Sequence, residues 1–526
     1  MSDLFSAYEV YLKDSKIPAY IIESTAPNNI DDNVNNLDTV RTTQIQKIVE
    51  KVGDITVNNV NADKLIAKIV DHLRLSDNPS LVISIHGFNN PFHVIIEGFL
   101  RTFKGVINDN AINNNRDVVC IGYRWPSEQI FAPARTALRA APNFLIGLLF
   151  VPVLVFLVAY LLSFERAEFL TIIAWTVGPC LFLVAMSVTT FILRIAVYFR
   201  DGYRATSYGV PDLVEIIQQI DKKYLEKEPK TKNDDGQLKR VELSFIGHSM
   251  GAYVVTGAVR ILSNVFDDRS RRPDLNVRPG DLPASMSSEI GGAFILKRLV
   301  LVSPDIPAET LISGRANFLS TSLLRFEEAS IFSNEGDEVL RQISTTANYF
   351  SFPTTHNKFG YRLGNLCLSD IEYGITRDIN LKKLQIGRES LHSIYSEMEK
   401  MGSDPLRDDL PKHFSYFDCT SCIENKQGGV ESGSGVLTLA KLGPAKKMGP
   451  FNHFCLLFLY IILPRIYDVH GGYFRSQFLG KLIYRLACIG YEETKTAFEK
   501  EAKLDFGGKD TFDAELKRRQ IKVLKS

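Results

Sequence analysis

Ser249 lies at the centre of the pentapeptide GHSMG, with Gly247 and Gly251 two positions away on either side. A serine hydroxyl is a weak nucleophile at neutral pH, so it needs a histidine base, an acid that orients the base, and N–H donors for an oxyanion. The pentapeptide alone is a weak signal. It indicates a nucleophile when a strand precedes it and a helix follows, and the sequence predicts a strand over 241–246 and a helix over 252–266. Ser249 is therefore the candidate nucleophile.

Candidate oxyanion donors precede this serine in the sequence. His86, Gly87 and Phe88 follow the apolar segment LVISI, residues 81–85, which predicts a strand. An isolated His-Gly pair is more often an ordinary turn. At a strand end upstream of the serine, it favours an oxyanion hole made by the backbone N–H groups of Phe88 and Met250, with His86 and Gly87 in support.

Short apolar segments alternate with amphipathic ones along most of the chain. This alternation predicts a mostly parallel sheet with helices on both faces, in which reactive groups collect at the carboxyl ends of the strands. The predicted strands are 81–85, 117–123, 241–246, 298–303 and 329–333, and the predicted helices are 62–75, 93–106, 211–224 and 252–266.

Two uncharged apolar runs, 144–162 and 169–193, interrupt this pattern. Helices of about 19 and about 25 residues, at about 1.5 Å per residue, are long enough to cross a hydrocarbon core of roughly 30 Å. We expect a transmembrane hairpin inserted into the fold, the alternative being a buried helical hairpin. Arginines flank the pair at 135, 139, 194, 200 and 204, so the positive-inside rule predicts an integral membrane protein whose catalytic part is cytoplasmic.

Four motifs together resemble the α/β-hydrolase family: HGFNN (86–90), RWPSE (124–128), GHSMG (247–251) and VSPDIP (302–307). More narrowly, they resemble bacterial α/β-hydrolases of undefined substrate with HGYNN-like, WPS and AHSMG-like segments. The resemblance runs from about residue 80 to about residue 490. It implies an α/β-hydrolase fold and a catalytic triad in the chain order serine, acid, histidine.

Two aspartates compete for the role of the acid. Asp305 follows the first predicted strand beyond Ser249, and Asp337 follows the second. The resemblance favours Asp337, because the family usually places its acid after the second of these strands. Asp305 is the alternative. Either carboxylate could instead cap a turn or a helix.

The resemblance assigns the base to His470, with His413 as the alternative. DVHGGYFR, residues 468–475, supplies a histidine and a glycine-rich turn before an amphipathic helix, as in the family's final segment, although Gly471 and Gly472 replace the usual residues. His413 precedes a predicted strand within 412–420. The remaining histidines considered are expected on the surface, namely those at 356, 392 and 453.

An insertion over about 423–464 ends in an apolar segment, 454–463, which is too short to span a bilayer. It could be an interfacial segment, a lid over the site or a core helix.

Cys419 and Cys422 lack a second ligand pair, so no metal site is expected, and no cofactor is implied. The seven cysteines are scattered along the chain, which favours a reducing compartment over a disulfide framework. The chain has 61 basic and 60 acidic residues, and this balance argues against a nucleic-acid-binding surface.

The chain is thus expected to contain five parts. Residues 1–143 are an N-terminal extension and the first part of the hydrolase domain, 144–193 are the membrane hairpin, and 194–339 are the core with the nucleophile. Residues 340–411 are an insertion or cap, and 412–526 hold the last strand, the apolar insertion, the histidine and the closing helix. The expected function is a membrane-anchored serine hydrolase that cleaves carboxylic esters, with lipid acyl esters as the favoured class. The alternatives are a thioesterase or amidase on the same fold, and a non-catalytic membrane scaffold.

Overall fold

The computed structural model describes most of the α/β part of the chain. The described residues are 4–12, 17–26, 37–113, 117–127, 191–226, 239–266, 288–307, 322–347, 362–365, 413–423, 450–462, 469–506 and 512–525, with short pieces at 147, 154, 157–158, 184–185, 188–189, 385–386 and 389–390.

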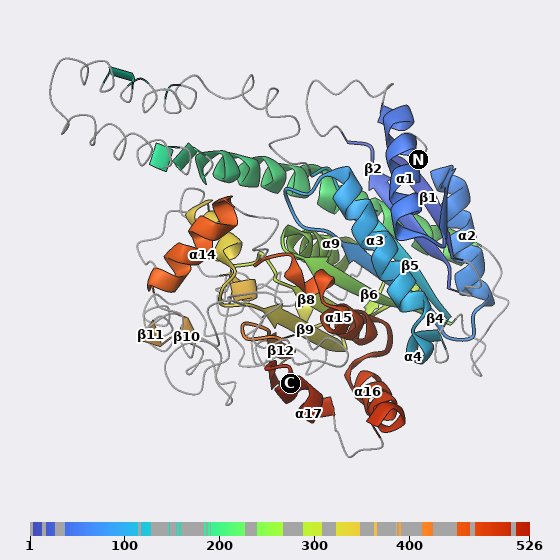
Figure 1. The fold of residues 1–526 in the computed structure, drawn as a ribbon. Helices are drawn as coiled ribbons and strands as arrows, with labels where there is room; N and C mark the ends of the chain where they lie inside the picture. The colour runs from blue at the N-terminus through green and yellow to red at the C-terminus, as the bar shows by residue number, and fades with distance from the viewer. Residues whose placement is uncertain are drawn as a thin grey trace, which may run out of the picture.

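One large mixed sheet lies at the centre of the structure (Figure 1). Its strand order is β13-β12-β9-β8-β6-β4-β5-β2-β1-β3, and β7 pairs with β8. The pairs from β2 through β5, β4, β6, β8 and β9 to β12 are parallel, and the antiparallel pairs involve β1, β3, β7 and β13. The strands are β1 (Phe5–Leu12), β2 (Ala19–Ser24), β3 (Ile55–Val60), β4 (Pro79–Ile85), β5 (Asp117–Arg124), β6 (Val241–His248), β7 (Glu289–Ile290), β8 (Phe294–Val302), β9 (Glu328–Ser333), β12 (Phe414–Asp418) and β13 (Lys522–Leu524).

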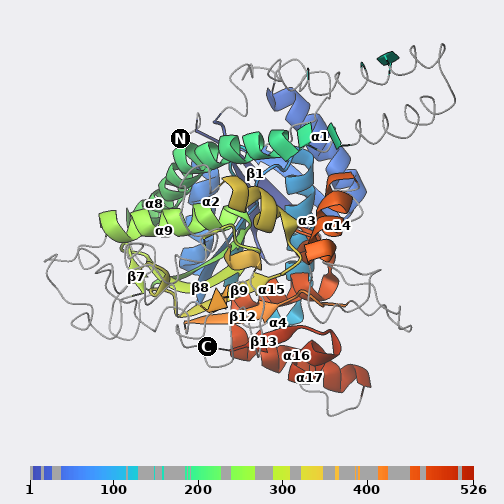
Figure 2. The same ribbon diagram turned by 90° about the vertical axis from the view of Figure 1, so that its left-hand side faces the viewer.

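Helices cover both faces of the sheet, as Figures 1 and 2 show from two directions. Helices α2, α8 and α9 pack on one face, and α1, α3 and α15 lie on the other. The helices are α1 (Leu37–Val52), α2 (Ala62–Leu75), α3 (Phe92–Ile107), α4 (Asn110–Asn113), α8 (Val210–Glu226), α9 (Met250–Phe266), α14 (Pro450–Ile462), α15 (Gln477–Ile489), α16 (Tyr491–Phe506) and α17 (Phe512–Arg518).

The central strands are apolar on both sides because each face is covered. In β4, Leu81 and Ile83 belong to the core beneath α2, α8 and α9, whereas Val82 belongs to the core beneath α3 and α15. All seven residues of β4 are buried. Successive side chains of a strand point to opposite faces, so a strand between two helical layers reads as a continuous apolar run.

The sequence-based prediction of a mostly parallel α/β sheet is confirmed, and the predicted helix 62–75 coincides with α2. Helix α1 and strand β3 were not predicted. Helix α1 is largely polar and buries only a narrow stripe that includes Ile45 and Ile48, and β3 buries only its first residue and contains two asparagines, which are depleted in strands. The predicted spans 144–162 and 169–193 lie, for most of their length, outside the described residues. Within the described part of the chain, no helix combines the length and apolar character needed to cross a bilayer.

Candidate active site

Ser249 occupies the turn between β6 and α9, as the sequence predicts. Its φ angle of 55° lies in the left-handed region, which is strained for a residue with a side chain. Its backbone is fixed on both sides: Ser249 N donates to Val302 O at 2.9 Å, and Ser249 O accepts from Asp305 N at 3.1 Å. The turn therefore holds the serine in one backbone conformation at the carboxyl end of β6.

The two glycines that flank the serine allow this tight turn. A Cβ added to Gly247 would lie 2.7 Å from Ala252 Cα, and one added to Gly251 would lie 2.5 Å from His86 O. Both contacts are with backbone atoms, which cannot move aside without disturbing the strand. Glycine is therefore required at these positions for α9 to pack against β6 and against the end of β4.

The His86-Gly87-Phe88 segment passes directly beside the serine. A Cβ added to Gly87 would lie 2.7 Å from Ser249 Cβ and 3.2 Å from Ser249 Oγ. The Phe88 ring lies 6.3 Å from the ring of His470, centroid to centroid. The structure thus places the segment predicted to supply an oxyanion donor against both the candidate nucleophile and the candidate base.

Asp337 and His470 form a pair. Nδ1 of His470 lies 2.7 Å from Oδ2 of Asp337, whose side chain is fully buried. Oδ1 of Asp337 accepts from the backbone N–H of Leu340 at 3.1 Å, and the Ser303 hydroxyl donates to Oδ2. The carboxylate is therefore held on both oxygens, in an orientation that presents one of them to the imidazole.

Two further contacts bring the His470 segment to the serine. Asn334 Nδ2 donates to Val469 O at 2.9 Å, which joins this segment to the loop after β9. Nε2 of His248 lies 3.2 Å from His470 O, and the rings of His248 and His470 are 5.1 Å apart. Because His248 directly precedes Ser249, these contacts place the Asp337–His470 pair beside the nucleophile turn.

The Ser249 side chain is buried, and its Oγ has no hydrogen-bond partner among the described residues. A buried hydroxyl without a partner is uncommon, since buried polar groups are usually hydrogen-bonded. In unliganded active sites, the hydrogen bond between a nucleophile and its base is often long or poorly aligned. The unpartnered Oγ is therefore compatible with a nucleophile.

The structure does not bring Asp305 or His413 to a comparable pair. Asp305 forms an ion pair with Arg362 at 3.2 Å and accepts from Ser344 Oγ at 3.1 Å. His413 directly precedes β12, which runs parallel to β9. It therefore lies at the amino end of the parallel strands, whereas Ser249 lies at the carboxyl end. Burial lowers the pKa of His413, and backbone groups of Leu323 and Phe326 contact it.

Two other histidines at the site, His86 and His248, are buried. Burial, with Arg124 as a smaller cause, lowers the pKa of His86 to about 3. Burial, with His470 as a smaller cause, lowers the pKa of His248 to about 3. Both rings are therefore uncharged at neutral pH. The His86 ring stacks on Trp125 with centroids 5.2 Å apart, so it packs the His86-Gly87-Phe88 segment against the segment after β5.

The sequence-based assignment of His453 to the surface is wrong. His453 is buried on α14, and its Nδ1 lies 2.5 Å from Oε1 of Glu338. The signal that could have found it is helical spacing, since His453, Leu456 and Tyr460 share one face of α14. The histidines at 356 and 392 lie outside the described residues.

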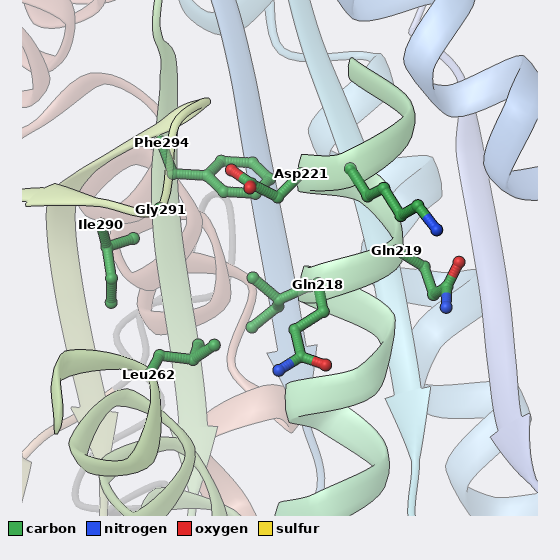
Figure 3. Close-up of a pocket in the computed structure, with 9 residues that line it drawn as sticks. Gln218, Gln219, Asp221, Leu262, Ile290, Gly291 and Phe294 are labelled. Carbon is green, nitrogen blue, oxygen red and sulfur yellow. The ribbon is translucent and has the colours of Figure 1, made fainter. Parts of the chain in front are cut away.

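A cavity of about 240 Å³ lies at the other end of the sheet, between α8, α9 and the start of β8 (Figure 3). Phe294, Ile290 and Leu262 line it from one side, and Gln218 and Asp221 from α8 line the other. None of the predicted site residues lines this cavity. Ligands of open α/β sheets bind at the carboxyl ends of the strands, so the candidate site is the one built around Ser249.

The fold and site together define an α/β protein with a mostly parallel sheet, which gathers a strained serine and a carboxylate–imidazole pair at the carboxyl ends of its strands. Comparison of the chain with family models, with curated protein sequences and with solved structures finds no significant match.

Proposed function

We propose that this protein is a membrane-anchored serine hydrolase with an α/β-hydrolase fold, which cleaves carboxylic esters and acts on lipid acyl esters. The observation that carries the proposal is the position of the Asp337–His470 pair. It lies beside the turn that holds Ser249 at a φ angle of 55°. A fully buried aspartate bonded to Nδ1 leaves Nε2 as the basic nitrogen of the imidazole.

In the proposed mechanism, Ser249 Oγ attacks the acyl carbon and His470 Nε2 takes the hydroxyl proton. The N–H groups of Phe88 and Met250 stabilise the negative oxygen of the tetrahedral intermediate. Its collapse breaks the C–O bond, and His470 returns the proton to the departing alcohol. Water, deprotonated by His470, then attacks the acyl-serine, the bond from the acyl carbon to Ser249 Oγ breaks, and His470 returns the proton to Oγ, which releases the carboxylic acid and free Ser249. Asp337 holds the imidazole tautomer and stabilises the imidazolium.

The exposed face of α14 supports a lipid substrate. Phe451, Phe454 and Phe458 follow helical spacing and are 76%, 66% and 40% exposed. The opposite face carries the buried His453 and Leu456, so the helix is anchored while its aromatic side faces outward. Exposed aromatic side chains at helical spacing are typical of segments that enter the interfacial region of a membrane.

The location of α14 supports the same reading. The Arg194 guanidinium lies 4.5 Å from the ring centroid of Tyr460 on α14. Arg194 immediately follows the apolar run 169–193, which we propose as the second membrane span. A helix in contact with the end of that span would lie at the membrane surface. The arginines at the span ends support a cytoplasmic catalytic part.

The test is labelling by a fluorophosphonate probe in membranes, comparing the wild-type protein with Ser249→Ala. The proposal expects wild-type labelling that Ser249→Ala abolishes. An unlabelled wild-type protein would support a non-catalytic scaffold instead. Hydrolysis of matched ester, thioester and amide substrates by the labelled protein then decides the bond class, because the same triad serves all three.

A further inference from the structure

Asp201 holds the segment that follows Phe88. Its side chain is fully buried, and its Oδ2 accepts from the backbone N–H of Asn89 at 2.9 Å. The same oxygen accepts from Ser127 Oγ at 3.3 Å. Ser127 Oγ in turn accepts from the backbone N–H of Asn90 at 3.2 Å. One carboxylate thus fixes, directly and through Ser127, the two amides that come immediately after Phe88.

This segment needs to be held. Asn89 has a φ angle of 56°, in the left-handed region, which asparagine adopts more readily than most residues with side chains. The turn conformation is therefore sharp at this residue, and its position depends on the bonds made by the Asn89 and Asn90 amides. The bond from Asn89 N to Asp201 fixes the peptide plane between Phe88 and Asn89. The Phe88 N–H lies in the preceding peptide plane, which joins this one at the Phe88 Cα, so fixing the later plane restricts where that N–H can point.

The other oxygen of Asp201 faces basic groups. Oδ1 lies 2.9 Å from Nη2 of Arg200 and 3.8 Å from Nη1 of Arg204. Burial raises the pKa of the Asp201 carboxyl above its ordinary value, and Arg200, the Asn89 N–H and Arg204 oppose this rise by favouring the charged form. The contacts with the two arginines hold Oδ1, so that Oδ2 stays in place as the acceptor of the Asn89 amide.

We infer that Asp201 is a positioning residue for the oxyanion hole, acting on the Phe88 N–H through the Asn89 and Asn90 amides. The inference rests on the proposed function. Asp201 lies in a helical segment that follows the apolar run 169–193, so the same carboxylate connects the proposed second membrane span to the catalytic loop. A small displacement of a preorganised donor is expected to reduce catalysis strongly, because the donor must be in place before charge develops.

The test compares Asp201→Ala, Ser127→Ala and the control Asp221→Ala in the full-length protein in membranes. Asp221, which is labelled in Figure 3, is a matched control, because its carboxylate also fixes backbone amides. It accepts from Gly292 N at 3.1 Å and Ala293 N at 2.8 Å, away from the Ser249 turn. Turnover of a soluble ester is divided by the number of sites titrated with a fluorophosphonate, so that unfolded protein does not count. Asp201→Ala is expected to lower kcat per titrated site at least tenfold, with KM changed less than about threefold.

Ser127→Ala should lower kcat per site in the same direction by a smaller factor, because the direct bond from Asn89 to Asp201 remains. Asp221→Ala should lower the melting temperature and leave kcat per site within about twofold of wild type. An unchanged kcat per site in Asp201→Ala would overturn the inference while leaving the proposed function intact. An equal loss in Asp221→Ala would also overturn it. Failure of the wild type to label would instead refute the proposed function.

Discussion

Glu338 and His453 form a buried pair with Oε1 and Nδ1 2.5 Å apart, next along the chain from the pair of Asp337 and His470. Two consecutive carboxylates thus each hold one histidine. Asp337 binds the histidine of the candidate triad, and Glu338 binds the inner face of α14. The peptide bond between Asp337 and Glu338 therefore links the candidate acid to the residue that holds α14 in place.

His453→Ala is expected to release α14 from the protein. The change leaves Glu338 buried without its imidazole partner, which should lower the free energy of unfolding by about 3 kcal/mol. It should also speed chymotrypsin cleavage after the exposed aromatic residues of α14, because His453 and Leu456 form the anchored side of the helix and cleavage requires the backbone to unfold locally. Melting temperature and the rate of cleavage within 450–462 measure the two effects.

The control for this experiment is Asn452→Ala, which changes a neighbouring half-buried residue outside the pair. It should leave both measurements near wild type. Equal cleavage rates for His453→Ala and Asn452→Ala would contradict the anchoring role of the pair.

Asp337→Asn and Asp305→Asn are expected to separate catalysis from stability. Asp337→Asn keeps the shape of the side chain but should lower kcat by 10²-fold or more, because an amide can force the wrong imidazole tautomer. Asp305→Asn weakens the buried ion pair with Arg362, so its main effect should be a loss of roughly 3 kcal/mol of stability. Active-site titration with urea unfolding measures both quantities. A larger loss of kcat per site in Asp305→Asn would reverse the choice of acid.

The local part of the site could be predicted from the sequence because its signals are local. The strand, the turn with Gly247 and Gly251, and the following helix are contiguous, and the structure has β6, Ser249 and α9 in that order. The placement of Asp337 and His470 came from a resemblance rather than from the residues. They are 133 residues apart, and no local pattern reports such a contact.

The contacts that support the site could not be predicted for the same reason. Asp201 is 112 residues from Asn89, and His453 is 115 residues from Glu338. Helical spacing can place His453 on the inner face of α14, but no local pattern identifies the partner of a buried polar group. The sequence therefore predicts the segments of the candidate site better than it predicts the long-range contacts that position those segments.

The aromatic face of α14 is expected to increase activity at lipid surfaces. Replacing Phe451, Phe454 and Phe458 with serine removes three exposed rings without touching the buried face. Activity on a short-chain ester should then persist below its critical micelle concentration, and the rise in activity above that concentration should fall at least threefold. Leu75→Ser, which alters a residue 67% exposed at the end of α2, is the control. A rise that survives the triple change would mean that α14 does not contact lipid.

His248 should make the stability of the protein depend on pH. Its pKa is about 3 in the folded state, against about 6.5 for an ordinary histidine, so the unfolded chain binds one more proton between these values. The contribution of His248 is complete above pH 6.5 and is lost as the pH falls toward 3. His248→Gln keeps an N–H near the His470 carbonyl and cannot titrate. Urea unfolding at pH 7 and pH 5 should therefore show that wild type loses about 2 kcal/mol more than His248→Gln over this interval. Equal losses in the two proteins would mean that His248 is not buried in its neutral form.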